Sequence, residues 1–159
     1  MAEPAKRFRF KPRFRGLALG AVGLGTTLTG VSLVALGAAF LPLATGAAGI
    51  ALGAAYLLSP TWKLEVVVDD EALEVRSARV SKFRLAWNDV KKVIASNTTP
   101  TCFVDGGSPE KSLLVPGDGA PAPYDIEDKP DLVASILSHV AADKVHRVDT
   151  LDSTRSASS

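Results

Sequence analysis

The pattern of hydrophobic and polar positions changes once along the chain, near residue 63. From Gly16 to Trp62 the sequence holds no charged residue and consists mainly of Gly, Ala and Leu. This stretch is more than twice as long as the roughly 20 apolar residues that cross a bilayer core of about 30 Å. The pattern therefore predicts a membrane α-helical hairpin with two crossings.

Pro42 divides this hairpin, because proline breaks a helix unless it lies in the first turn. We expect a transmembrane segment over residues 16–61, with helices at about 16–37 and 42–59. Small residues at GxxxG spacing let helix backbones approach closely. Both arms carry such a pair, and the helix-packing candidates are Gly16, Gly20, Gly49 and Gly53. These glycines serve either contact between the two arms or contact between subunits.

From Lys63 onward apolar and polar residues alternate, beginning with Leu64, Val66 and Val68. A period of two with polar turns every eight to ten residues is typical of antiparallel strands that have one solvated face. We expect about seven short strands, at residues 64–68, 73–75, 83–87, 91–96, 101–105, 111–115 and 122–126.

One amphipathic helix is expected after the strands. Asp128 is a candidate N-cap and Pro130 suits the first turn. A single apolar stripe follows at helical spacing: Leu132, Val133, Ile136, Leu137 and Val140. The predicted organisation is a basic N-terminus over residues 1–15, the hairpin over 16–61, a soluble α+β or mainly-β domain over 62–142, and a disordered polar tail over 143–159.

Charge is distributed unevenly, with a net +5 over residues 1–62 and −4 over residues 63–159. Basic residues directly before a first crossing stay on the cytoplasmic side, and a second crossing returns the chain to that side. We therefore expect a two-helix protein of the cell inner membrane with both termini cytoplasmic. A cleaved signal peptide also begins with basic residues, but its apolar region is only about 7–15 residues long.

The sequence shows no catalytic constellation, no cofactor-binding motif and no metal-ligand set, so we expect a protein that is not an enzyme. Its one cysteine, Cys102, excludes an intramolecular disulfide. His139 and His146 are too far apart on a helix to share a metal, being about 10 Å apart. The acidic run Asp69 to Glu71 lacks the alternating oxygen ligands of a calcium loop, and a solvated turn is expected there.

A basic cluster comes after that turn, and its alternating positions predict one outward strand face. Such a face meets anionic lipid headgroups at about 1 kcal/mol per residue, or it is a solvated face whose lysines discourage sheet-to-sheet pairing. The candidate lipid-facing residues are Arg76, Arg79, Lys82, Arg84, Lys91 and Lys92.

Three segments carry a resemblance to a known family: "DDEALEVR", "FRLAWNDVKKV" and "YDIEDKPDLVASIL". In this order and spacing, Leu64 to Val140 resembles a bacterial pleckstrin-homology-like (PH-like) domain, of the kind joined to an N-terminal pair of transmembrane helices. The resemblance implies a bent antiparallel sheet of about seven strands, capped by one C-terminal helix and without catalytic activity. Lipid-binding members carry a basic first hairpin, whereas this chain has Asp69-Asp70-Glu71, so phosphoinositide binding does not carry over.

These features predict a non-enzymatic, membrane-anchored interaction module on the cytoplasmic face. Its expected partners are the lipid bilayer and either a protein or lipid headgroups, with no nucleic acid and no small-molecule substrate. The alternative is an oligomeric membrane scaffold that self-associates through its glycine-rich helices.

Overall fold

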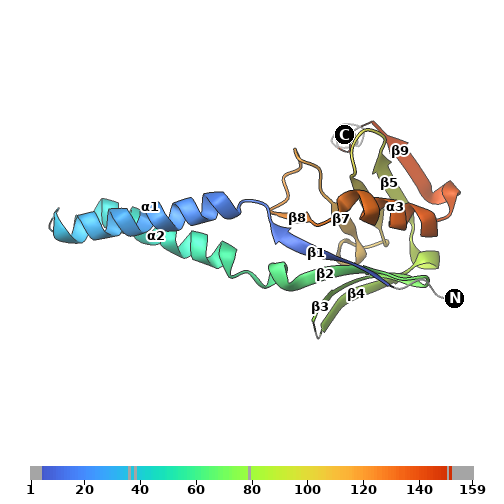
Figure 1. The fold of residues 1–159 in the computed structure, drawn as a ribbon, viewed down its shortest axis with the longest axis horizontal. Coiled ribbons are helices and arrows are strands. Elements are labelled where there is room, and N and C mark those ends of the chain that lie inside the picture. The colour runs from blue at the N-terminus through green and yellow to red at the C-terminus, as the bar shows by residue number, and fades with distance from the viewer. Residues whose placement is uncertain (1–4, 36, 38, 79, 150, 152–159) are drawn as a thin grey trace. The chain divides into compact units, whose positions relative to one another are not determined.

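The structure is a computed structural model, and it describes residues 5–35, 37, 39–78, 80–149 and 151 (Figure 1). It divides the chain into two compact units, one of residues 12–62 and one of residues 1–11 with 63–159. The first is a pair of long apolar helices, and the second is rich in β-sheet and has one longer helix. This α+β organisation confirms the coarse prediction from sequence.

The helix unit consists of α1 (Arg15–Val34), α2 (Phe40–Leu57) and the single turn η1 (Pro60–Lys63). By length and composition alone, both long helices could cross a membrane. Pro42 lies in the first turn of α2, where its missing N–H leaves no helical hydrogen bond unmade. The chain therefore turns two to three residues earlier than Pro42 suggested.

Small residues form the contact between α1 and α2. A Cβ atom added at Gly25 would lie 2.6 Å from the carbonyl oxygen of Gly46, and one added at Gly46 would lie 2.7 Å from that of Gly25. The helices thus approach backbone to backbone at this point. Beyond it, the hydroxyl of Ser32 donates a hydrogen bond of 2.9 Å to the carbonyl of Ala39, which ties the end of α1 to the start of α2.

Among the described residues of the sheet-rich unit, nine strands form two sheets. The first sheet has the order β4-β3-β2-β1-β8 and the second has the order β7-β6-β5-β9. The strands are β1 (Lys6–Pro12), β2 (Leu64–Val68), β3 (Ala72–Ser77), β4 (Val80–Ala86), β5 (Lys92–Ser96), β6 (Cys102–Asp105), β7 (Leu113–Val115), β8 (Tyr124–Ile126) and β9 (Val145–Val148). Each of the seven segments expected to be extended overlaps one of the strands β2 to β8.

One hydrophobic core joins both sheets to α3 (Lys129–His139). Leu132 and Ile136 of α3 are fully buried with Val66 of the first sheet and Val93 of the second. The apolar stripe predicted for this helix therefore faces the core. Three single turns connect the remaining elements: η2 (Trp87–Asp89), η3 (Pro109–Lys111) and η4 (Ala142–Lys144).

The segment expected only as a basic N-terminus contains strand β1. Phe8 and Phe10 are buried while Arg7 and Arg9 are exposed, which is the period of two of a strand with one covered face. β1 pairs antiparallel with β2, with Phe8 opposite Val66. This raises the strand count above the predicted seven and makes β1 an interior strand of the first sheet.

The expectation of a disordered tail from residue 143 is wrong for its first part. Residues up to Lys144 complete η4, and β9 then pairs in parallel with β5. The hydroxyl of Ser96 also donates a hydrogen bond of 2.9 Å to the carbonyl of Asp149. Backbone pairing therefore orders a segment whose side chains are mostly polar, while residues 152–159 lie outside the described residues.

The start of α3 also differs in detail from the prediction. Asp128 occupies the N-cap position, but its backbone is left-handed, with φ of 48°, and its side chain makes no capping hydrogen bond. Polar contacts at the start of the helix come from Lys129 instead. Its Nζ lies 3.1 Å from Asp125 Oδ1 and donates a hydrogen bond of 3.2 Å to the carbonyl of Pro116. These contacts hold the loop between β7 and β8 against the helix.

The two ends of the first sheet differ in their connections to the rest of the chain. At the helix-linked end, β1 ends at Pro12 and β2 begins at Leu64, so both neighbouring strands continue into the helix unit. At the opposite end, named the free end, β2 continues into the β2–β3 turn of Asp69, Asp70 and Glu71. A strand of five residues separates these ends by about 16 Å.

Candidate functional site

The six basic candidates do not form one continuous face. Arg76, Lys82 and Arg84 lie on β3 and β4 of the first sheet, whereas Lys92 lies on β5 of the second sheet and Lys91 just precedes it. Arg79 lies outside the described residues.

Two of these cations are neutralised by partners on the same sheet. Arg76 Nε lies 2.9 Å from Glu65 Oε1, and Arg84 Nη2 lies 3.1 Å from Glu71 Oε2. Lys82 is exposed and forms no ion pair with any residue that the structure describes. The net positive charge on β3 and β4 is thus smaller than the sequence indicated.

Strand β1 adds cations that the sequence analysis did not assign to the sheet. Arg7 and Arg9 are exposed, lie opposite Val67 and Glu65 of β2, and have no ion-pair partner within the described part of the chain. The signal was present in the sequence as the alternation of Arg7, Phe8, Arg9 and Phe10.

The four glycines proposed for helix packing separate into two groups. Added Cβ atoms at Gly49 and Gly53 would meet the α1 carbonyls of Ala21 and Ala18 at 3.2 and 2.8 Å, so both glycines face α1. Added Cβ atoms at Gly16 and Gly20 would meet no described atom within 4 Å. The sequence analysis missed Gly25 and Gly46, which face each other across the helix contact.

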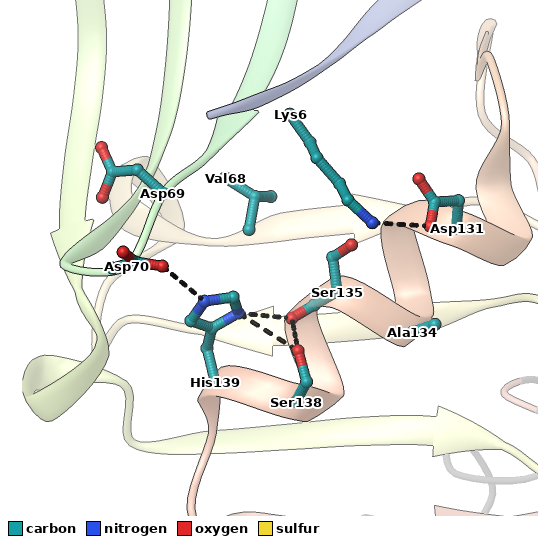
Figure 2. Close-up of a pocket in the computed structure, with 9 residues that line it drawn as sticks. All are labelled: Lys6, Val68, Asp69, Asp70, Asp131, Ala134, Ser135, Ser138 and His139. Atoms are coloured by element: carbon teal, nitrogen blue, oxygen red, sulfur yellow. Dashed lines mark hydrogen bonds and ion pairs between the residues drawn. The ribbon is translucent and has the colours of Figure 1, made fainter. Parts of the chain in front are cut away.

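A cavity of about 330 Å³ opens at the free end of the first sheet, between the β2–β3 turn and α3 (Figure 2). Its polar lining comes from three elements: Lys6 of β1, Asp69 and Asp70 of the turn, and Asp131, Ser135, Ser138 and His139 of α3. Lys6 Nζ lies 2.9 Å from Asp131 Oδ1, and this ion pair forms one side of the cavity.

His139 is held in one orientation at the other side. Its ring stacks on the indole of Trp87, with the centroids 5.0 Å apart and an interplanar angle of 17°. Its Nδ1 lies 2.8 Å from the carbonyl oxygen of Ser135, and because a carbonyl only accepts, Nδ1 carries the proton. In the neutral ring, Nε2 therefore presents a lone pair, 3.7 Å from Asp70 Oδ1.

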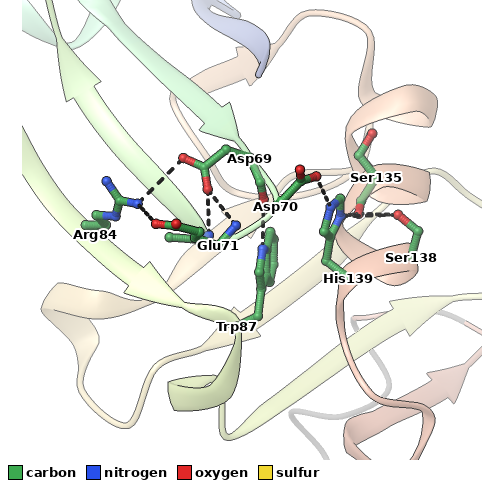
Figure 3. A network of polar contacts seen from close by, with 9 residues as sticks. Asp69, Asp70, Glu71, Arg84, Trp87, Ser135, Ser138 and His139 are labelled. Carbon is green, nitrogen blue, oxygen red and sulfur yellow. Dashed lines mark hydrogen bonds and ion pairs between the residues drawn. The ribbon is translucent and has the colours of Figure 1, made fainter. Parts of the chain in front are cut away.

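The β2–β3 turn is fixed by a separate set of hydrogen bonds (Figure 3). Asp69 Oδ1 accepts from the backbone N–H groups of Glu71 and Ala72, at 2.9 and 2.7 Å. Trp87 Nε1 donates to the carbonyl of Asp69 at 2.8 Å. Asp69 is thus occupied in shaping the turn, while the Asp70 carboxylate faces His139 and accepts no hydrogen bond from the residues described here.

Two groups outside the cavity have shifted pKa values. Burial raises the pKa of the Cys102 thiol to about 12, so it stays protonated at neutral pH and is a poor nucleophile. Partial burial acts to raise the pKa of Asp125, but its contacts with Lys129, the N–H of Ile126 and Lys11 outweigh burial and hold that pKa below its ordinary value.

Within the ranges that the structure describes, no group of three or more His, Cys, Asp or Glu side chains is arranged to hold a metal ion. His146, which the sequence analysis considered as lying on one helix with His139, lies on β9 opposite Ile94. The cavity therefore offers carboxylate, hydroxyl and imidazole acceptors rather than a metal-ligand set.

Comparisons of the chain with protein families, with curated proteins and with solved structures gave no match.

Proposed function

We propose that the chain is a non-enzymatic, membrane-anchored interaction module. In this proposal α1 and α2 cross the inner membrane as a hairpin, both termini are cytoplasmic, and the sheet-rich unit is a PH-like domain that binds a protein partner or lipid headgroups.

The pairing of β1 with β2 carries this proposal. The two strands are neighbours in one sheet, with Arg9 opposite Glu65, yet the whole helix pair lies between them in the sequence. They can pair only if the chain enters and leaves the helix pair on the same side of a membrane. An even number of crossings satisfies this condition, and removal of a signal peptide would remove β1 as well.

The exposure of the helices supports a lipid environment. Their buried residues are small: Ala18, Gly25 and Ser32 in α1, and Gly46 and Gly53 in α2. Their large apolar side chains point outward, as shown by Leu17 and Leu41, which are each 76% exposed. Exposing these apolar side chains to water would be unfavourable, whereas contact with lipid tails is not. Close packing of small residues then holds the helices together.

The strand order supports the PH-like assignment. Strands β2 to β8 overlap the seven expected segments, and α3 follows them as the longest helix among the described residues of the unit. The chain departs from the simple expectation by adding β1 and β9 and by forming two sheets.

Basic residues at the helix-linked end support contact with anionic lipid headgroups. Arg13 and Phe14 alone separate β1 from α1, a distance of at most about 10 Å for Pro12 to Arg15. Lys11 and Lys63 adjoin the same end of the sheet. Each basic residue near a negatively charged membrane surface contributes about 1 kcal/mol.

Cysteine labelling of whole cells tests the topology. In a Cys102→Ala background, a membrane-impermeant maleimide should label Phe40→Cys, at the start of α2, in intact cells. It should label Glu110→Cys, on exposed η3, only after the membrane is opened. Labelling of Glu110→Cys in intact cells, or recovery of the chain in the soluble fraction, would contradict the proposal.

The second candidate is an oligomeric scaffold, and the open glycines of α1 favour it. Gly16 and Gly20 have GxxxG spacing and do not face α2. Their side of α1 is therefore available for close packing against a helix of another subunit. The double variant Gly16→Leu/Gly20→Leu should then reduce the particle mass in detergent to that of a monomer, whereas Leu52→Ile on α2 should leave it unchanged. An unchanged mass in the glycine variant would reject the scaffold.

A further inference from the structure

We propose that the cavity at the free end of the first sheet binds a cationic N–H donor, an ammonium or guanidinium group. This inference rests on the proposed function and deepens it, because it names the chemistry by which the interaction module recognises its partner. The cavity of about 330 Å³ accommodates one such group with its aliphatic stem.

The charge of the lining favours a cation. Three carboxylates line the cavity, and two of them have cationic partners: Lys6 Nζ lies 2.9 Å from Asp131 Oδ1, and Arg84 Nη2 lies 3.8 Å from Asp69 Oδ2. Asp69 is engaged by the backbone of its own turn. The carboxylate of Asp70 is half exposed and retains its capacity to accept hydrogen bonds.

The hydroxyl of a buried serine in the cavity is the second, independent observation. Ser135 is only 6% exposed, and its side-chain oxygen has no hydrogen-bond partner in the part of the chain that the structure describes. Figure 2 shows this oxygen directed toward the side of the cavity that holds Lys6, away from the carbonyl that His139 contacts. The Ser135 oxygen itself reaches the cavity, where it is free to accept a hydrogen bond from a bound donor.

The arrangement of acceptors selects among possible ligands. Asp70 Oδ1 and His139 Nε2 are 3.7 Å apart. Both are acceptors when the ring is neutral, so they cannot bond each other, and one N–H-rich group can donate to both. An ammonium group has three donors and a guanidinium group has five, and neither needs an acceptor from the protein. An anion would face the carboxylates.

Titration of the full chain in detergent micelles tests the inference with defined probes. The probes are an acetylated and amidated Gly-Arg-Gly peptide, 1,4-diaminobutane, the matched Gly-Gln-Gly peptide and sodium acetate. We expect saturable binding of one or both cationic probes and none of the neutral peptide or of acetate. Binding of the peptide assigns the cation to a protein partner, and binding of the diamine alone assigns it to a free amine.

Two substitutions locate the binding. Asp70→Asn should weaken it about tenfold or more, since it removes a charged acceptor, and Ser135→Ala should weaken it severalfold. Both positions tolerate these changes, because Asp70 lies in an exposed turn and alanine suits a helix, and unchanged near-ultraviolet circular dichroism would check the fold. The matched control Glu110→Gln, on exposed η3, should bind as the unsubstituted chain does.

Absence of saturable binding by both cationic probes would overturn the inference, as would equal binding by the Asp70→Asn variant. Either result would leave the labelling test of the membrane anchor unaffected, so the two proposals fail separately.

Discussion

The two units of this chain place the same kinds of residues in opposite environments. In the sheet-rich unit, large apolar residues such as Leu73 and Ile136 are fully buried. In the helix pair, the buried residues are Gly, Ala and Ser, and none of the leucines is buried. Water explains the first arrangement through the hydrophobic effect. The proposed lipid environment accounts for the second, because in lipid close packing of small residues replaces that effect.

This contrast predicts that the two units respond in opposite ways to a change in side-chain volume. The sheet-rich unit should be sensitive to removal of volume, because its core is closely packed. The helix pair should be sensitive to addition of volume at its contact.

The largest effect is expected for Gly46→Leu. An added Cβ at Gly46 would already lie 2.5 Å from Thr29 Oγ1 and 2.7 Å from the carbonyl of Gly25, so a whole leucine cannot fit and the helices must separate. Spin labels at exposed Leu19 and Leu52 should report a longer and broader distance distribution than in the unsubstituted pair. The matched variant Gly20→Leu, where space is open, should leave the distance unchanged. An unchanged distance in Gly46→Leu would show that the helices do not pack through this glycine.

In the sheet-rich unit, Phe8→Ala should lower the free energy of unfolding by about 3–5 kcal/mol. Phe8 is 3% exposed and packs in the core through a strand outside the segment that the sequence assigned to this unit. Urea denaturation in detergent, followed by near-ultraviolet circular dichroism, measures the loss. Arg7→Ala, on the other face of the same strand, should change stability by about 0.5 kcal/mol or less. Equal effects of the two variants would mean that β1 does not contribute to the core.

A smaller effect is expected where polar contacts, rather than volume, hold the sheet-rich unit together. Lys129→Ala should destabilise it by about 1–3 kcal/mol, because Asp125 and the carbonyl of Pro116 lose a charged donor. The same denaturation assay applies, with Lys111→Ala on exposed η3 as the control. A loss as small as that of the control would indicate that these contacts form only a solvated ion pair.

The smallest effect is a dependence of stability on pH. The folded-state pKa of Asp125 lies below the ordinary value of 3.8, so its contribution is complete above that value and is lost as the pH falls through the lower folded-state pKa. Between pH 5.5 and pH 3, the unfolding midpoint of the unsubstituted chain should therefore fall further than that of Asp125→Asn. Parallel midpoints in the two proteins would contradict this account.

Local periodicity predicted most of the elements, since both apolar helices, β2 to β8 and α3 arise from patterns within short windows. It did not reveal β1, because its four alternating residues Arg7 to Phe10 pair with a strand that comes after the entire helix pair. For β9 the covered positions Val145 and Val148 are few, and its order comes from backbone pairing with β5. Spacing alone identified Gly49 and Gly53 but could not tell which face of α1 they meet.

The cavity could not be predicted at all from the sequence. It depends on the meeting of Asp70, in the β2–β3 turn, with Ser135 and His139 on α3, and on the stacking of His139 against Trp87. Each of these residues has an ordinary solvated role when its sequence neighbours alone are considered. Only the tertiary packing of α3 beside the turn brings their acceptors together.

The position of β1 has a consequence for the order of events during synthesis. β1 leaves the ribosome first, but both of its neighbours in the sheet, β2 and β8, are made after the helix pair. At about 5–20 residues per second, the segment between β1 and β2 takes about 3 to 10 s to translate. During that interval Phe8 and Phe10 have no neighbouring strand to cover them. In the proposed topology, the sheet closes only after the second helix has returned the nascent chain to the side of the membrane on which β1 lies.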